Sequence, residues 1–263
     1  MLTLKKTKSF TNGNVHLLHT EDGYPIETTD TFLPFYTKDA IGRHQNCLED
    51  GNLGSRSERW MIGVSTMSGC PVGCKFCATG KLKRCRNLTS DEIIEQVMMM
   101  IKMNNRAPCN AKEFKINYTR MGEPGLNLKN VLEAIDCIDF IYQDHKIHHY
   151  ISTIGIKGVD YGFVKNNITL QFSVHSFDEE YRNWLIPFKN KITIEEMGKV
   201  RTNSDLKTTL NLTMAREEDF NIVKLKEYFD PEKFFCKVSP INVNSESEKN
   251  NMGKGIITQK NLK

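Results

Sequence analysis

Six short runs of β-strand character follow one another from about residue 60 onward, and helical stretches separate them. The runs are WMIGVST (60–66), FKINYTRM (114–121), HHYISTIGI (148–156), ITLQFSVHS (168–176), KTTLNLTMA (207–215) and FFCKVSPINV (234–243). β runs that alternate with helices at this spacing are typical of parallel βα units. The sequence therefore predicts an α/β protein built on six parallel strands.

The first helical stretch has the clearest pattern. Thr89 and Glu92 stand three residues apart, as in a capping box, so a helix is expected to begin at about Ser90. Its apolar face is predicted from helical spacing to contain Ile94, Val97, Met98 and Ile101. A second helix is expected to contain Val131, Leu132, Ile135 and Ile138. Shorter helical stretches are expected near Tyr161, Tyr181, Ile194 and Leu225.

The β runs alternate between apolar and polar residues, although a parallel sheet covered by helices on both faces has strands that are apolar throughout. In ITLQFSVHS the polar set is Thr169, Gln171, Ser173 and His175. A sheet curled into a partial, six-stranded parallel β/α barrel explains the alternation, with helices outside and a polar lumen open to a cofactor and substrate. An open sheet with one exposed face is the alternative.

The chain divides into three predicted segments. Residues 1–58 contain turn signals and short β-like pieces such as VHLLH, which predicts a β-rich N-terminal extension. Residues 59–244 carry the six β runs of the predicted barrel. Residues 245–263 are polar and rich in lysine, so we expect a tail that is at most partly docked.

The composition is that of an ordinary globular protein of 263 residues, 39% of them hydrophobic and 26% charged. No apolar run approaches the ~18 residues of a membrane span, and MLTLKKTKSF at the start lacks the apolar core of a secretory signal. We therefore expect a cytoplasmic protein with no membrane contact. The formal net charge of +4 permits a polyanionic partner without requiring one.

Three of the eight cysteines, Cys70, Cys74 and Cys77, lie within eight residues in SGCPVGCKFCATG. Thiolates this close in a loop can surround one metal centre, and three of them on a 4Fe-4S cluster leave one iron open to a substrate or cosubstrate. The alternative is a zinc site with Cys85 as the fourth ligand. Packing is the simplest role for Cys109, Cys137 and Cys236.

This segment, with Phe76 directly before the third cysteine, resembles the signature of the radical S-adenosylmethionine (SAM) superfamily. Further motifs follow in the order found in one of its families: RNLTSDEIIEQV (86–97), MGEPGLN (121–127), ISTIG (151–155), FSVHS (172–176) and SPINVN (239–244). Over roughly residues 60–244 the chain resembles the dual-specificity ribosomal- and transfer-RNA adenine methyltransferases and their antibiotic-resistance relatives.

The resemblance implies two cofactors and the residues that bind them. Cys70, Cys74 and Cys77 would hold a 4Fe-4S cluster whose open iron binds the amino and carboxylate groups of SAM. Positions that match SAM-contacting residues of the family lie at or near strand ends, where βα-barrel sites are built. They are Gly122, Glu123, Ser152, Ser173, Val174, His175 and Asn242.

Two cysteines of the family's methyl-transfer route have no counterpart here. The resolving cysteine lies seven residues before the first cluster cysteine, where this chain has Gly63. The methyl-carrying cysteine lies in a Cys-Gly-Gln-Leu context near the family's C-terminus, and this chain ends at Lys263 without it. DGYPIET resembles the stretch around a catalytic glutamate, which makes Glu27 a candidate acid or base, with a solvated surface carboxylate as the alternative.

We therefore expect a monomeric radical SAM enzyme that takes an electron from reduced flavodoxin or ferredoxin and forms a 5′-deoxyadenosyl radical. The radical would abstract hydrogen from a substrate, with RNA or a nucleotide-like molecule as its expected class. One alternative is an RNA adenine methyltransferase with a different carrier cysteine, such as Cys47 or Cys236. Another is a non-enzymatic, metal-stabilised RNA-binding protein whose basic run contacts phosphate through Lys81, Lys83, Arg84 and Arg86.

Overall fold

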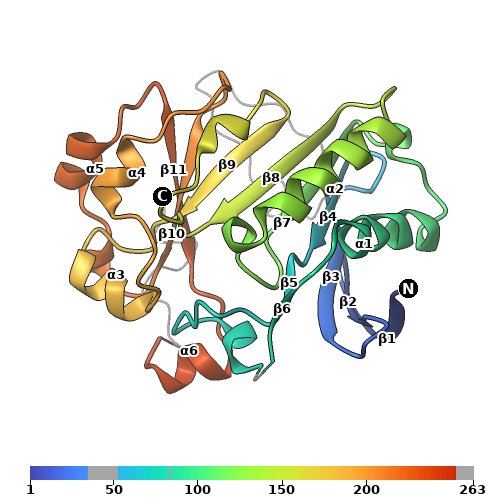
Figure 1. Ribbon diagram of the computed structural model, residues 1–263, viewed down its shortest axis with the longest axis horizontal. Coiled ribbons are helices and arrows are strands. Elements are labelled where there is room, and N and C mark those ends of the chain that lie inside the picture. The colour runs from blue at the N-terminus through green and yellow to red at the C-terminus, as the bar shows by residue number, and fades with distance from the viewer. Residues whose placement is uncertain (35–52, 83, 253–263) are drawn as a thin grey trace. The chain divides into compact units, whose positions relative to one another are not determined.

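The computed structural model describes residues 1–34, 53–82 and 84–252 (Figure 1). The chain forms two compact units, and each is assembled from separate stretches of sequence. The first unit contains Met1–Ser68, Asn87–Met121 and Asn127–Tyr150. The second contains Gly69–Arg86, Gly122–Leu126 and the chain from Ile151 onward. Two of the second unit's segments are thus short loops that carry the cysteine motif and the MGEP motif.

The first unit is built on a mixed sheet. Its strands are β1 (Thr3–Phe10), β2 (Gly13–His19), β3 (Pro25–Leu33), β4 (Arg59–Val64) and β7 (Glu113–Tyr118), followed by the start of β8 (Ile147–Thr153). Antiparallel pairing joins β1 to β2, β2 to β3 and β3 to β4, whereas β4 and β7 are parallel. The predicted β-rich N-terminal extension is therefore a three-stranded antiparallel addition to the first of the six parallel strands.

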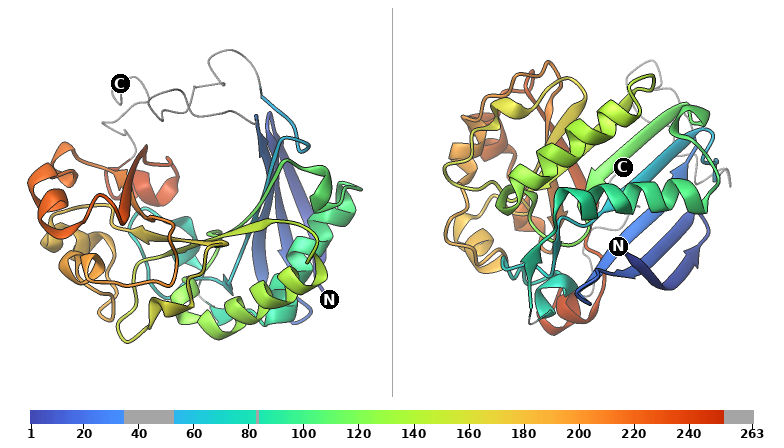
Figure 2. Two further views of the ribbon diagram at one scale, coloured as in Figure 1. Left: turned by 90° about the horizontal axis from the view of Figure 1, so that it is seen from above. Right: turned by 45° about the vertical axis from the view of Figure 1, so that its right-hand side comes forward.

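Two helices of equal length lie side by side in this unit, α1 (Ser90–Met103) and α2 (Leu128–Ile141), as both views in Figure 2 show. A 3-10 helix, η2 (Pro108–Asn110), and the short strands β5 (Met67–Ser68) and β6 (Arg86–Asn87) complete the elements along this stretch. Helix α2 buries Val131, Ala134, Ile135 and Ile138. This agrees with the predicted second helix.

Helix α1 begins where the sequence predicts, but it buries another face. The capping box is present, since the Glu92 N–H donates to Thr89 Oγ1 at 3.2 Å and the Thr89 N–H donates to Glu92 Oε2 at 3.0 Å. The buried side chains are Ile93, Gln96, Val97 and Met100. Of the predicted face, Val97 is buried, Ile94 and Ile101 are half-buried, and Met98 is exposed, so the prediction is wrong for Met98.

Gln96 explains the rotation of this helix face. Its amide oxygen accepts from the Ser65 N–H at 2.9 Å and from the Thr28 hydroxyl at 2.8 Å, and its amide nitrogen donates to the Ser65 carbonyl at 3.0 Å. A buried polar group that is satisfied in this way costs little, so the helix can turn Gln96 inward and leave Met98 exposed.

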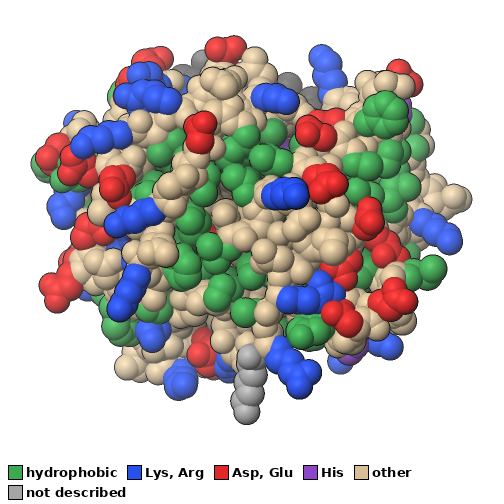
Figure 3. All heavy atoms as spheres, in the orientation of Figure 1, with side chains coloured by type: hydrophobic (Ala, Val, Ile, Leu, Met, Phe, Trp, Pro, Cys, Tyr) green, Lys and Arg blue, Asp and Glu red, His purple; other side chains and the backbone are tan. Residues whose placement is uncertain are grey.

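The second unit contains the end of β8 with β9 (Ile168–Ser173), β10 (Thr208–Met214) and β11 (Phe234–Pro240), in that order. β9, β10 and β11 are parallel. Its α-helices are α3 (Glu179–Leu185), α4 (Ile194–Gly198), α5 (Ile222–Tyr228) and α6 (Ser245–Lys249). Its 3-10 helices are η1 (Ala78–Lys81), η3 (Pro124–Leu126), η4 (Tyr161–Phe163) and η5 (Glu217–Asp219). Helices α4 and α5 are neighbours in Figure 1, and acidic and basic side chains are interspersed over α3, α4 and α5 in Figure 3.

The predicted alternation along the strands is confirmed. In β9 and just beyond it, Ile168, Leu170, Phe172 and Val174 are buried, whereas Thr169, Gln171 and Ser173 are partly exposed. All six predicted β runs form strands in the predicted order, as β4, β7, β8, β9, β10 and β11. The shorter helical stretches also appear at the four predicted places. The segment boundaries at residues 58 and 244 stay predictions.

Candidate functional site

The cysteine motif forms a loop between β5 and η1. Hydrogen bonds to main-chain atoms fix the middle of this loop. The Lys75 N–H donates to the Leu185 carbonyl at 2.9 Å, and the side-chain amide of Asn250 donates to the Lys75 carbonyl at 2.8 Å. The side-chain amide of Asn244 donates to the Phe76 carbonyl at 2.9 Å. Because Asn244 and Asn250 flank α6, this helix and the end of α3 hold the loop between Cys74 and Cys77.

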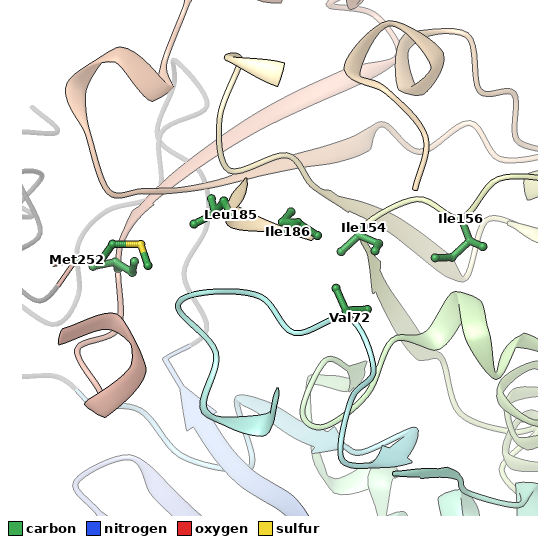
Figure 4. Packing of buried hydrophobic residues seen from close by; sticks show 7 residues of the cluster. Val72, Ile154, Ile156, Leu185, Ile186 and Met252 are labelled. Carbon is green, nitrogen blue, oxygen red and sulfur yellow. The ribbon is translucent and has the colours of Figure 1, made fainter. Parts of the chain in front are cut away.

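An apolar cluster anchors the same loop. Val72 points toward residues that follow β8 and end α3, as Figure 4 shows, and the buried members of the cluster are Val72, Ile154, Ile156, Leu185, Ile186, Ile241 and Met252. Cys70, Cys74 and Phe76 pack against this cluster. The hydrophobic contacts and these hydrogen bonds together anchor the loop.

The three cysteines are free thiols in a half-buried setting. Burial raises the pKa of Cys70 to about 12 and raises the pKa of Cys74 well above its usual range. Nearby negative charge contributes in the same direction: Glu123 acts on both thiols, as does Cys77. Cys70 and Cys74 would release their protons on binding a metal, because the thiolate is the ligand.

The donor set fits an iron–sulfur cluster better than a single zinc ion. Among the described residues, no three His, Cys, Asp or Glu side chains form a group that could hold one metal ion. Cysteines on a four-iron cluster each bind a different iron atom, so their sulfurs need not converge on one point. Cys85, the fourth ligand of the zinc alternative, is exposed. Three thiols on one anchored loop suit the cluster that the resemblance implies.

Glu123 is a buried carboxylate in the same unit, with 4% of the residue exposed. It follows Gly122, whose φ of 104° lies in the left-handed region that favours glycine. Oε1 accepts from the Thr153 hydroxyl and from the Gly125 N–H at 2.8 Å, and Oε2 accepts from the Ile154 N–H at 3.0 Å. Burial raises the pKa of Glu123, although these three donors oppose the shift. The MGEP motif thus delivers an oriented acceptor to the end of β8.

The other predicted SAM contacts lie at the ends of the same strands. Ser152 and Ser173 are half-buried near the ends of β8 and β9, Val174 is fully buried, and Asn242 is exposed just after β11. All seven predicted SAM positions and the three cysteines belong to the second unit. The structure therefore brings together every predicted cofactor residue within one compact unit.

His175 has a backbone conformation that few residues adopt outside glycine, with φ of +61°. The Thr213 N–H donates to its Nδ1 at 3.1 Å, so the neutral ring carries its proton on Nε2. Its ring packs edge-to-face on Phe76 with centroids 4.9 Å apart. Burial, with a smaller contribution from Arg182, lowers the pKa of His175 to about 3. His175 is thus a neutral packing partner of the cysteine loop.

Sequence reasoning missed Arg182, which is fully buried beneath this site. Nε donates to the Val174 carbonyl at 3.2 Å, Nη1 to the Ile192 carbonyl at 2.9 Å and Nη2 to the Ile154 carbonyl at 3.0 Å. Burial lowers its pKa to about 10, so it remains charged. The available signal was its spacing: it stands three residues before Leu185, on the face of α3 that is buried.

Gly63 and Glu27 belong to the first unit, on neighbouring strands. Gly63 pairs with Thr29 across β3 and β4, and a Cβ placed on Gly63 would overlap Thr29 Oγ1 and lie 3.0 Å from Cδ of Arg120. Arg120 forms an ion pair with Glu27. The space where the family's resolving thiol would stand is therefore filled by two other side chains.

The remaining cysteines divide by exposure. Cys109 is exposed, so its predicted packing role is wrong, whereas Cys137 is half-buried. Cys236 lines an apolar cavity with Leu210, Phe229 and Phe234, and burial raises its pKa. Cys47 and Lys83 lie outside the described residues. Lys81, from the basic run, pairs with Glu246 of α6 at 2.9 Å.

Among the described helices, none combines the length and apolar character that crossing a bilayer requires.

No protein-family model matches. The chain is 33% identical over 178 residues to a probable dual-specificity RNA methyltransferase RlmN of Chlorobium phaeobacteroides, which is 65% of this chain and 49% of that protein. It is 38% identical over 162 residues to the one of Dictyoglomus turgidum, which is 57% of this chain and 45% of that protein. The chain thus spans about half the length of these relatives.

A solved structure gives the fold. The chain superposes on a radical SAM methyltransferase from Sphaerobacter thermophilus with a TM-score of 0.66 and 20% identity, over 92% of this chain and 67% of that one. This likeness confirms the predicted fold class, an α/β fold of radical SAM type. The chain therefore has the radical SAM methyltransferase fold and is related in sequence to the dual-specificity RNA methyltransferases.

Proposed function

We propose that this protein is a radical SAM enzyme that forms a 5′-deoxyadenosyl radical and abstracts hydrogen from a carbon of RNA or of a nucleotide-like substrate. One observation carries the proposal: three free cysteines on an anchored loop share a compact unit with the buried carboxylate Glu123. The fold of the solved radical SAM methyltransferase supports it. The sequence relation to RNA methyltransferases supports RNA as the substrate class.

Cys70, Cys74 and Cys77 would each hold one iron of a 4Fe-4S cluster and leave the fourth iron for SAM. Bound there and reduced by one electron from flavodoxin or ferredoxin, the cluster supplies the electron that cleaves SAM into methionine and the 5′-deoxyadenosyl radical. A hydrogen atom taken from the substrate then completes 5′-deoxyadenosine and leaves the radical on the substrate carbon.

The chain's own residues position the cosubstrate. Glu123 presents a carboxylate, oriented by Thr153, Gly125 and Ile154, whose negative charge can attract the ammonium group of SAM. Ser152, Ser173 and Asn242 add polar groups, while Val174 and His175 form the packed floor that excludes water. Glu27 is the proposed acid or base in the first unit, where it forms an ion pair with Arg120.

The second candidate function is methyl transfer to adenine in RNA, which the names and fold of the relatives favour. The family's resolving step needs a thiol where this chain has Gly63, with Thr29 and Arg120 in that space. Methyl transfer by this chain therefore requires a different resolving sulfur. Cys236 is poorly suited to that role, because it faces an apolar cavity beside α5.

Mass spectrometry of an anaerobic reaction separates these functions. The reconstituted protein is incubated with reduced flavodoxin, deuterated-methyl SAM and total RNA. The proposal expects 5′-deoxyadenosine, with no deuterated methyl group on any cysteine or on adenine. Deuterated methyladenine in RNA would establish the methyltransferase instead. If the protein binds iron after reconstitution but cleaves no SAM, the result supports a metal-stabilised RNA-binding protein instead.

A further inference from the structure

A cavity of about 490 Å³ lies in the second unit, between α3, the chain that follows β8 and the loop that leads to α4. Four cationic side chains line it, from Lys157, Arg182, Lys189 and Lys191, and Glu179 contributes a carboxylate. None of the residues predicted to bind the cluster or SAM lines this cavity. The cavity is therefore a second polar site.

The wall of this cavity is fixed by main-chain hydrogen bonds. The Lys157 N–H donates to the Asn190 carbonyl at 2.8 Å, and the Ile192 N–H donates to the Gly155 carbonyl at 3.0 Å. Lys191 is 7% exposed, and its Nζ donates to Asn183 Oδ1 at 2.5 Å and to the Phe188 carbonyl at 3.3 Å. The positive charge of Lys191 is thus built into the cavity and does not belong to a freely moving surface side chain.

The carboxylates near this cavity are already engaged in capping α4. Glu179 Oε1 accepts from the Ile194 N–H at 2.6 Å, and its Oε2 lies 4.0 Å from Arg182. Glu196, which interacts with Lys157 electrostatically, accepts from the Thr193 N–H at 2.7 Å. Lys157 and Lys189 form no ion pair with any residue that the structure describes.

The cations of the cavity act on one another. Burial lowers the pKa of Lys191, the charges of Arg182 and Lys157 add to the shift, and Glu179 and Cys74 oppose it. The guanidinium of Arg182 donates to three carbonyls, so its main contribution to the cavity is its positive charge and not N–H groups for a ligand. Like charges at close range repel one another, and a bound anion such as a phosphate group would relieve this repulsion.

We infer that this cavity binds a phosphate group, held by Lys157 and Lys189 at its mouth and by the charge of Lys191 and Arg182 behind them. The inference rests on the proposed function in taking the RNA backbone as the source of the phosphate. Phe188 lines the cavity and also packs on the apolar cluster that anchors Cys70 and Cys74. A strand of RNA held here would therefore pass close to the cysteine loop.

The test compares two double variants of the full chain after reconstitution with iron. Lys157→Ala with Lys189→Ala removes the two lysines at the mouth. Lys207→Ala with Lys233→Ala removes two exposed lysines beside the opposite, N-terminal ends of β10 and β11. Binding of a fluorescent oligouridylate of about 20 nucleotides is followed by anisotropy over a range of salt concentrations. Iron content and unfolding temperature are measured for every variant, so that misfolding is recognised.

We expect the cavity variant to bind the oligouridylate ~10-fold more weakly at 0.1 M salt, with a log–log salt slope shallower by about 0.7, because single strands give ~0.7 per neutralised phosphate. The control variant, Lys207→Ala with Lys233→Ala, should change the affinity less than 2-fold. Calorimetry with pyrophosphate identifies the source of the phosphate. If only pyrophosphate binding is lost in the cavity variant, the cavity takes the phosphate of a small molecule.

Unchanged binding of both probes, or equal losses in the two double variants, would overturn the inference. Formation of 5′-deoxyadenosine by the unsubstituted protein without RNA tests the proposed function separately. If the unsubstituted protein cleaves no SAM, but the Lys157→Ala, Lys189→Ala variant binds RNA more weakly, the phosphate site stands and the radical chemistry is refuted.

Discussion

The cysteine loop and the end of strand β4 are two places where the family pattern calls for sulfur, and they differ in this chain. The loop keeps its three thiols and is fixed by main-chain bonds from α6 and α3 and by apolar contacts through Val72. At Gly63 the thiol is absent, and Thr29 and Arg120 fill the space. The three cysteines of the loop are therefore present without a cysteine at position 63, because each place has its own local packing.

The largest effect should follow from removing a loop cysteine. Cys74→Ala should abolish the binding of about four iron and four sulfide per chain, because all three thiolates are needed to hold the cluster. Anaerobic reconstitution followed by iron and sulfide analysis measures this. Cys109→Ala, an exposed cysteine outside the loop, is the matched control and should bind iron as the parent does. Stoichiometric zinc that requires Cys85 would refute the iron–sulfur assignment.

The next effect concerns SAM affinity. Glu123→Gln should weaken SAM binding about 10–100-fold, since it removes a charge-assisted hydrogen bond worth roughly 1.5–3 kcal/mol while leaving the iron ligands intact. Equilibrium binding of SAM to the reconstituted protein gives the affinity, and the visible spectrum reports the cluster. Glu195→Gln, an exposed carboxylate on α4, is the control. An unchanged affinity would make MGEP a structural turn only.

The Gly63 region should resist a restored thiol. Gly63→Cys should lower the free energy of unfolding by about 1–3 kcal/mol, because the new Cβ overlaps Thr29 Oγ1 and crowds Arg120. Urea unfolding measures the change. Adding Thr29→Ala removes the closest atom and should recover more than half of the loss, with Thr29→Ala alone completing the cycle. A stable Gly63→Cys variant would show that Arg120 and Thr29 move aside readily.

The smallest effect is a pH dependence from His175. Its pKa of about 3 in the folded chain lies below the ordinary 6.5, so between these values the unfolded chain binds the extra proton and acid favours unfolding. From pH 7.5 to 5.5 this group should cost about 1.4 kcal/mol of stability. His175→Asn tolerates the positive φ and should show a shallower decline over the same range. Parallel pH profiles for the two proteins would contradict the neutral, buried histidine.

Much of the fold follows from the alternation and spacing of residues along the chain. The six β runs, the capping box at Thr89 and the buried face of α2 are local patterns, and each survives in the structure. The buried face of α1 was missed because the run IIEQVMMMI permits two faces, and the choice depends on hydrogen bonds from Gln96 to Ser65 on another element. Contacts between distant residues decide what local spacing leaves open.

The candidate site shows the same division. The motifs stand at strand ends, and the structure has Glu123 and the three cysteines in one compact unit. The positive φ of His175 and its contact with Phe76 depend on strand β10, which lies about 35 residues further along the chain. Arg182 carries no motif at all. Its role became visible only when the three carbonyls around it were known.

Arg182 donates its three hydrogen bonds to backbone carbonyls, and this has a consequence for how the protein can evolve. Residues 154, 174 and 192 can be exchanged for others of suitable size without breaking these bonds, because every amino acid supplies the same carbonyl. Arg182 itself has no such freedom: lysine cannot direct donors along three fixed lines in one plane. Mutational tolerance around the cysteine loop should therefore be uneven, with one intolerant position surrounded by permissive ones.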